Sequence, residues 1–236
     1  MKKNAMLKIA AILMVAVLLT TCAISSTFAK YVTTGAATGN EVGRVAKWDV
    51  EIVSNVDGLF ADKYENGAVN ASGDDVVSVS TDNVVAPGTA NSASLTATLN
   101  GQPEVAFRLT TVATVSLSGW MVDLDGTGEG EAIYYCPLVV KVNGTAVEAG
   151  ANAAAFAANI KSAIETAATK DFAAGTELDD EVVGVTVEWA WDFDANGAGT
   201  NDAKDTILGE AGSSTISIAI QQTATQIKNY TAPAQG

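Results

Sequence analysis

The sequence predicts an all-β chain, an antiparallel β-sandwich of jelly-roll or Greek-key type with one inserted Ala-rich helix at about residues 151–170. The first observation is the stretch 183–193, whose odd positions are large and apolar while its even positions are small or polar. This period of two is typical of a strand with one buried face. The second is a composition dominated by Val, Thr, Ala, Ser and Gly, which favours strands and turns. The third is a series of about eight short strand-like stretches separated by turn signals.

The stretch 183–193 is predicted to be the central strand of the sandwich. Two of the four tryptophans, Trp189 and Trp191, fall on its apolar face. Aromatic side chains of this size are usually buried, so a core strand is favoured over a tryptophan platform for a ligand. The even positions, including Glu188, are expected to face solvent.

Residues 1–29 are predicted to be an export signal. Three lysines precede an apolar run at residues 9–19 that is too short for a comfortable membrane span. Thr27 and Ala29 supply the small residues of a cleavage site directly after Ala29. The alternative is a lipid-modified Cys22, because the residues before it resemble a lipoprotein box.

Residues 44–228 are predicted to form the sandwich domain. Residues 30–43, rich in Thr, Gly and Ala, are predicted to be a mobile segment able to act as a donor strand, and residues 229–236 a flexible tail. The first strand is predicted within residues 46–52, where apolar and charged side chains alternate. A type II turn is predicted at residues 86–89, where Gly follows Pro.

Turn signals divide the middle of the chain into further strands. Strands at residues 95–99 and 105–109 are predicted to pair as a hairpin across Asn100-Gly101. Asn143-Gly144 predicts a two-residue hairpin turn. Pro137, in the strand before that turn, favours an edge position or a bulge.

The last third of the chain departs from the β rhythm once. Residues 151–170 carry apolar side chains at three- and four-residue spacing, which predicts an amphipathic helix. Residues 194–212 are predicted to be a loop. Isoleucines alternate through residues 216–220 and predict the last strand.

Charge and residue content exclude several classes of function. The 236 residues include 27 acidic and 13 basic side chains, and a chain beginning at residue 30 carries 10 − 27 = −17. Phosphate backbones repel such a surface, so nucleic acid is not an expected partner, and no membrane span is expected in the mature chain. The lack of histidine excludes His-based zinc sites and Ser-His-Asp or Cys-His centres. Cys136 is the single cysteine outside the leader, so no intramolecular disulfide is expected.

Several stretches together resemble the TasA/camelysin family of exported bacterial proteins, whose leaders are cut by SipW-type signal peptidases. The stretches are Ala29-Lys30-Tyr31, Arg44-Val45-Ala46-Lys47-Trp48-Asp49-Val50, Val85-Ala86-Pro87-Gly88-Thr89, Glu188-Trp189-Ala190-Trp191 and Asp205-Thr206-Ile207-Leu208-Gly209. The resemblance implies a jelly-roll-like sandwich, export to the cell surface or biofilm matrix, and assembly into fibres. Part of the family has been described as casein-cleaving metalloendopeptidases. That activity conflicts with the lack of histidine here, because zinc would have only carboxylates or Cys136 as ligands.

One acidic stretch resembles the first half of a calcium loop, with oxygen ligands at positions one, three and five followed by Gly. Position twelve is Ala203 instead of Glu, so a complete EF-hand is excluded, and a later carboxylate would have to complete the site. The candidate calcium ligands are Asp192, Asp194, Asn196, Asp202 and Asp205. The alternative interpretation is an acidic turn that keeps the surface soluble. A second acidic loop, residues 123–131, has less regular ligand spacing.

These observations favour a secreted structural protein over an enzyme. We expect it to form homo-oligomers or filaments at the cell surface or in the extracellular matrix, with other matrix or cell-wall components as further partners. The segment 30–43 is expected to add as a strand to a sheet edge of the next subunit. A secreted calcium- or glycan-binding module is the first alternative, and a camelysin-like metalloendopeptidase is the second. No cofactor other than calcium is suggested.

Overall fold

The structure, a computed structural model, describes residues 44–64, 76–77, 82–124, 131–192, 201–228 and 230. The chain divides into two units, Met1–Ala46 and Lys47–Gly236, and the fold below is that of the second unit. The predicted export signal, cleavage site, donor segment and most of the tail lie outside the described residues.

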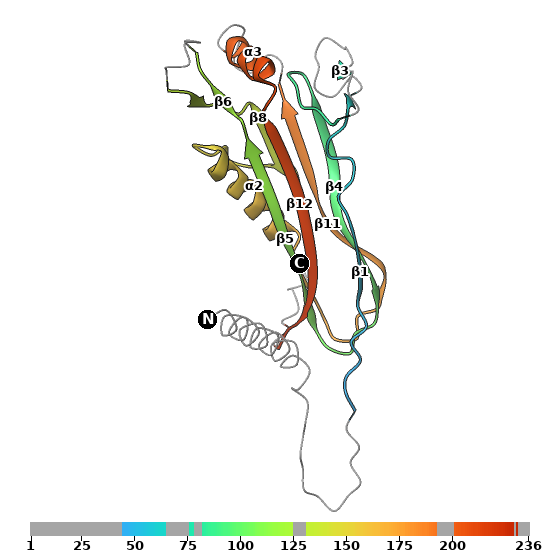
Figure 1. The fold of residues 1–236 in the computed structure, drawn as a ribbon. Coiled ribbons are helices and arrows are strands. Elements are labelled where there is room, and N and C mark those ends of the chain that lie inside the picture. Colours follow the sequence, from blue (N-terminus) through green and yellow to red (C-terminus); the bar gives the residue numbers. More distant parts are fainter. Residues whose placement is uncertain are drawn as a thin grey trace, which may run out of the picture. The chain divides into compact units, whose positions relative to one another are not determined.

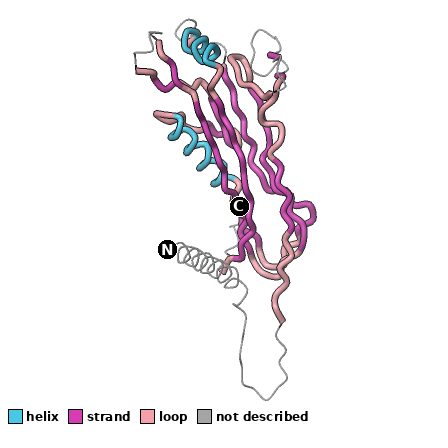
Figure 2. The backbone as a smooth tube through the Cα atoms, viewed as in Figure 1, coloured by secondary structure: helices cyan, strands magenta, loops and turns pink. Residues whose placement is uncertain are grey.

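Antiparallel β-strands are the predominant regular structure among the described residues of the second unit, as predicted (Figures 1 and 2). One sheet has the strand order β1-β4-β11-β8-β9 and another has the order β10-β5-β12. The bounds are β1 Glu51–Asn55, β4 Ala90–Gly101, β5 Phe107–Ser118, β8 Leu138–Val142, β9 Thr145–Ala146, β10 Lys170–Phe172, β11 Leu178–Trp191 and β12 Thr215–Gln226. Two short ladders join β2 Lys63–Tyr64 to β3 Val76–Val77, and β6 Met121–Val122 to β7 Ile133–Tyr134.

The predicted face of the central strand is confirmed. Val187, Trp189 and Trp191 on β11 are buried, together with the other odd positions from Val183. The ring of Trp189 contacts those of Phe60 and Tyr64. Side chains from both large sheets pack around Val187, Trp189 and Trp191 in one core cluster, whereas Val183 belongs to a second cluster with Leu99 and Phe107. Phe193, the last predicted inward residue, lies outside the described residues.

The predicted hairpin between residues 95–99 and 105–109 is wrong, because β4 and β5 belong to different sheets. β4 pairs with β1 and β11, whereas β5 pairs with β10 and β12. Asn100-Gly101 is therefore the point where the chain leaves one sheet for the other. At Gly101 the backbone has φ +114°, and an added Cβ would lie 2.3 Å from the carbonyl oxygen of Asp49. Glycine is needed there for a close backbone contact and not for a hairpin turn.

The first strand begins later than predicted, because β1 starts only at Glu51. The preceding residues contact the connection between β4 and β5 instead of a neighbouring strand. Trp48 is 43% exposed, and its ring meets that of Phe107 edge-on at a centroid distance of 6.0 Å.

The predicted turns are confirmed. Asn143 and Gly144 have φ values of 48° and 75°, the left-handed pair that a type I′ hairpin requires between β8 and β9. Gly88 has φ +81°, and the Thr89 N–H donates to the Ala86 carbonyl at 3.0 Å, as in a type II turn. Pro137 separates β7 from β8.

Two helices accompany the sheets. The predicted helix is α2, Ala153–Ala167, and the side chain of its N-cap residue, Asn152, accepts from the Ala155 N–H at 2.9 Å. The predicted loop 194–212 is wrong in its second half, because α3 spans Asp202–Ala211. α3 buries only Leu208, which explains why its apolar periodicity is weak in the sequence. In the described part of the chain, no helix is long and apolar enough to cross a membrane.

Candidate functional site: an open strand edge and its groove

The most distinctive feature of the structure is the outer edge of β12. Among the described strands, β12 pairs in its sheet with β5 alone. Ala113 of β5 lies opposite Ile220, and its backbone N–H and C=O both bond to α2, on the side away from β12. Ala113 and Ile220 are therefore a non-hydrogen-bonded pair, and Ile220 directs its own N–H and C=O away from β5. By the period of two, Ile218 and Ile216 do the same.

The opposite edge of this sheet is covered. β10 pairs with the first residues of β5. The next part of β5 contacts α2, which lies beside this strand (Figure 1). Glu165 accepts from the Ala113 N–H at 2.9 Å, and the Lys161 ammonium donates to the Ala113 carbonyl at 3.1 Å. Lys161 and Glu165 also pair with each other, and this pairing lowers the pKa of Glu165 below its ordinary value. The two side chains thus take the place of a peptide group from a neighbouring strand.

The two ends of the open edge of β12 have different surroundings. Near the C-terminal end of β12, the Ser54 hydroxyl of β1 donates to the Gln222 side chain at 2.6 Å. The N-terminal end of β12 instead borders a groove of ≈ 690 Å³ that lies between this strand and residues 82–87. Its lining includes Phe60, Trp120, Trp191, Leu208 and Ile216, with Asp82 and Asp205 adding carboxylates.

Trp191 is one of the residues that line this groove, and it is 4% exposed. Its indole Nε1 is buried and has no hydrogen-bond partner among the described residues. The neighbouring tryptophans differ in this respect. Trp120 Nε1 donates to the Thr215 carbonyl and Trp189 Nε1 donates to the Leu59 carbonyl, both at 2.8 Å. Buried polar groups are usually satisfied, so this N–H is an exception that needs a reason.

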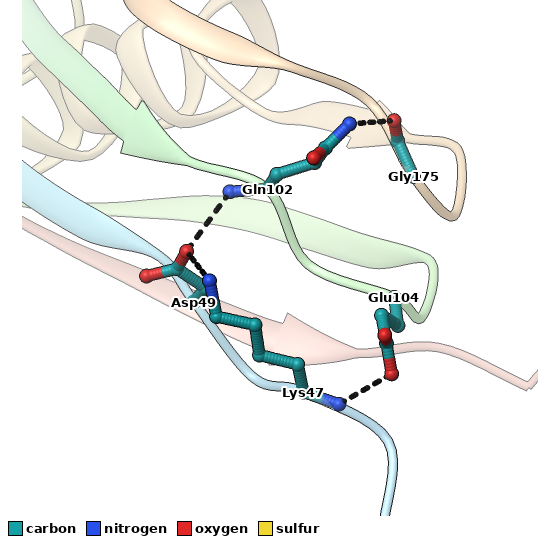
Figure 3. Close-up of polar contacts among 5 residues, drawn as sticks. All are labelled: Lys47, Asp49, Gln102, Glu104 and Gly175. Carbon is teal, nitrogen blue, oxygen red and sulfur yellow. Dashed lines mark hydrogen bonds and ion pairs between the residues drawn. The ribbon is translucent and has the colours of Figure 1, made fainter.

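A polar cluster fixes the point where the N-terminal chain enters the sandwich (Figure 3). The Lys47 N–H donates to a Glu104 carboxylate oxygen at 2.8 Å, and the Glu104 N–H donates to the Lys47 carbonyl at 3.0 Å. The Lys47 ammonium pairs with Asp49, which also accepts from the Gln102 N–H at 3.4 Å. Lys47 thereby lowers the pKa of Asp49. The Gln102 side chain reaches on to the Gly175 carbonyl at 3.3 Å.

This entry point and the groove lie at opposite ends of the sandwich. Asp49 lies beside Gly101, the last residue of β4, whereas the groove residues 82–87 precede the first residue of β4, Ala90. A strand of that length extends about 40 Å at roughly 3.3 Å per residue. β12 runs from the groove end toward the entry end, since its last residue pairs with Phe107 just beyond the entry cluster.

The candidate calcium ligands are only partly described. Asp192 directly follows β11, while Asp202 and Asp205 occupy the first turn of α3, where negative charge suits the helix dipole. Asp205 accepts from the Tyr135 hydroxyl at 2.8 Å, and burial together with this contact raises the pKa of Tyr135. Asp194 and Asn196 lie outside the described residues. Within the described ranges no group of three or more Cys, Asp or Glu side chains is placed to hold a metal ion, and calcium binding remains a prediction.

The thiol of Cys136 is partly buried, and burial raises its pKa to about 11. A thiol with such a pKa is a poor nucleophile at neutral pH.

The sequence matches no protein-family model and no curated protein. The resemblance to the TasA/camelysin family is therefore carried by short stretches of the sequence alone. Sequence patterns identified β12 as a strand. They did not identify its open edge, because whether a strand edge is free depends on which other strands lie beside it.

Proposed function

We propose that this chain is an exported structural subunit, a sandwich of jelly-roll or Greek-key type, that assembles into extracellular or cell-surface fibres by strand addition. The open edge of β12 is the observation that supports it best. Three residues, Ile216, Ile218 and Ile220, offer backbone N–H and C=O groups there, and extended chains bind such edges readily. On the other edge of the same sheet, β10 and the side chains of α2 already bond to the backbone of β5 as far as Ala113, which closes that part of the edge to an added strand.

The proposed donor is the segment 30–43 of a second copy, released by cleavage after Ala29. It contains Thr, Val and Tyr, which suit a strand. Its charges, Lys30 and Glu41, balance, so apart from a free amino group it is neutral. A neutral donor avoids the repulsion that an acidic segment would meet at a domain of this charge.

Strand direction favours exchange between subunits. Suppose that the subunits stack end on end in one orientation. The donor segment of one subunit then extends from its entry point into the groove end of the next subunit. In this arrangement the donor runs antiparallel to β12 of that next subunit, and every ladder in the two large sheets is likewise antiparallel. The same segment folded back onto its own subunit would run parallel to β12. A head-to-tail contact of this kind does not close, so it propagates into a filament.

A truncation tests this proposal. We expect a chain beginning at Lys30 to form filaments when salt is added or pH is lowered, because both reduce the repulsion between highly charged subunits. A chain beginning at Arg44 should stay unassembled under the same conditions. Light scattering and negative-stain microscopy measure assembly, and circular dichroism checks that both chains are folded.

Equal assembly by the two chains would contradict strand donation by residues 30–43. Failure of both to assemble would favour the monomeric binding module over a fibre subunit.

A further inference from the structure

We propose that the indole N–H of Trp191 is a recognition donor for the incoming strand and bonds to one of its backbone carbonyls. This inference rests on the proposed function, because it assigns a contact within the same acceptor groove. The occupant we propose is the segment 30–43 of a second copy.

Three properties of Trp191 support this role. Its ring lines the groove beside the N-terminal end of β12. Its N–H is buried and lacks a partner among the described residues, whereas the N–H groups of Trp120 and Trp189 are both bonded to backbone carbonyls. Leaving a buried donor unpaired costs stability. A donor of this kind beside an open strand edge is best explained by an acceptor that arrives with a partner.

The acceptor is best supplied by a peptide backbone. A strand paired with Ile216 and Ile218 directs alternate carbonyls toward β12 and the others away from it. The carbonyls that point away from β12 are free to meet the groove wall. A carboxylate is a poor alternative, because Asp82 and Asp205 already line the groove and would repel it.

Burial of the indole N–H favours the proposed hydrogen bond energetically. The Nε1 atom is shielded from solvent in the unliganded chain, so no bound water has to be stripped from it when the carbonyl arrives. The groove has to widen slightly to admit the carbonyl. The new bond then adds to the ladder along β12.

Indole resonances in NMR spectra test the contact directly. The processed chain beginning at Lys30, uniformly labelled with ¹⁵N and held at low ionic strength to suppress assembly, is titrated with a synthetic peptide of residues 30–43. We expect the Trp191 Nε1–H resonance to move downfield on binding. The Trp120 and Trp189 resonances should move little, because those N–H groups already have acceptors. The Trp191→Phe variant assigns the moving resonance by its loss.

Affinity supplies the second measurement. Trp191→Phe keeps an aromatic ring and removes the donor, so peptide binding should weaken by about 2- to 12-fold, the range for one neutral hydrogen bond. Trp189→Phe is the matched control. It removes the same donor from the same strand and breaks the bond to Leu59, so it should lower the melting temperature more than Trp191→Phe does, while leaving peptide affinity unchanged.

The outcomes separate this inference from the proposed function. If the peptide binds but the Trp191 resonance stays in place and Trp191→Phe binds equally well, the inference is overturned and strand addition stands. If the wild-type chain does not bind the peptide at all, both are overturned. Should Trp191→Phe fail to fold, triple-resonance spectra of the wild-type chain labelled with ¹³C and ¹⁵N assign the Trp191 indole resonance, and its shift on peptide binding decides.

Discussion

At the scale of single residues, close backbone contacts determine where the sandwich tolerates no side chain. Gly101 combines a φ of +114° with the near contact to the Asp49 carbonyl. Gly144 has φ +75° but nothing within 4 Å of an added Cβ. The two positions therefore separate the cost of backbone strain from the cost of a steric clash.

We predict that Gly101→Ala lowers the free energy of unfolding by at least about 2 kcal/mol, because strain and clash act together. Gly144→Ala should cost about 1 kcal/mol through strain alone. Urea denaturation followed by tryptophan fluorescence measures both. Equal costs for the two variants would show that the chain near Asp49 moves aside freely.

At the scale of elements, α2 works as a substitute strand for β5. Asn152 caps its start, and Phe156, Ile160 and Ile164 anchor its inner face in the core. Anchored in this way, the helix holds Lys161 and Glu165 against the Ala113 peptide groups. Natural sheets often cover an edge to prevent unwanted pairing, and this helix does so on one side only.

The paired state of Glu165 predicts a pH dependence. Lys161 holds the pKa of Glu165 below its unfolded value, so the carboxylate stabilises the fold above the ordinary Glu range. That contribution is lost as pH falls through the lowered pKa of the folded state. Glu165→Gln should therefore lower the urea midpoint at pH 7, and the difference from wild type should vanish in acid.

Glu51→Gln, at an exposed position of β1, is the control and should leave the midpoint unchanged at both pH values. If the difference in urea midpoint between wild type and Glu165→Gln persisted unchanged into strong acid, the charge of the Glu165 carboxylate would contribute nothing to stability.

At the scale of the whole molecule, the open edge of β12 and the distant entry point would give the proposed filament a direction. Each subunit would carry this acceptor near one end and its donor at the other, so the two ends of the filament would differ. The net charge opposes contact between subunits at low ionic strength and becomes less important as salt screens it.

A proline in β12 tests whether the two ends of the filament differ in this way. The Ile218 N–H points to the open edge, so Ile218→Pro removes no bond to β5 but blocks the acceptor. We expect this variant to stay folded, to fail to assemble alone, and to shorten wild-type filaments when mixed in at a small fraction, because it can still donate its own strand. Electron microscopy of filament length measures the effect.

Ser217→Pro is the matched control. Its N–H bonds to β5, so circular dichroism should show a loss of folding that Ile218→Pro does not cause. Filament growth by Ile218→Pro at the wild-type rate would show that the acceptor lies elsewhere.

Local signals in the sequence determined the strand around Trp189, the hairpin at Asn143-Gly144, the strand from Ile216 and the helix α2. Each depends on a period or a turn within a few residues, which the chain encodes without reference to distant segments. The candidate calcium ligands likewise follow from local spacing, and two of the five fall outside the described residues.

Only the tertiary structure decided that β4 and β5 separate into two sheets, that α3 forms against the core through Leu208, and that β12 has β5 as its one sheet neighbour among the described strands. These features depend on strand order and on packing between residues far apart in the chain. Free edges and unpaired buried donors are defined by what lies next to them in space, and a local pattern carries no information about that.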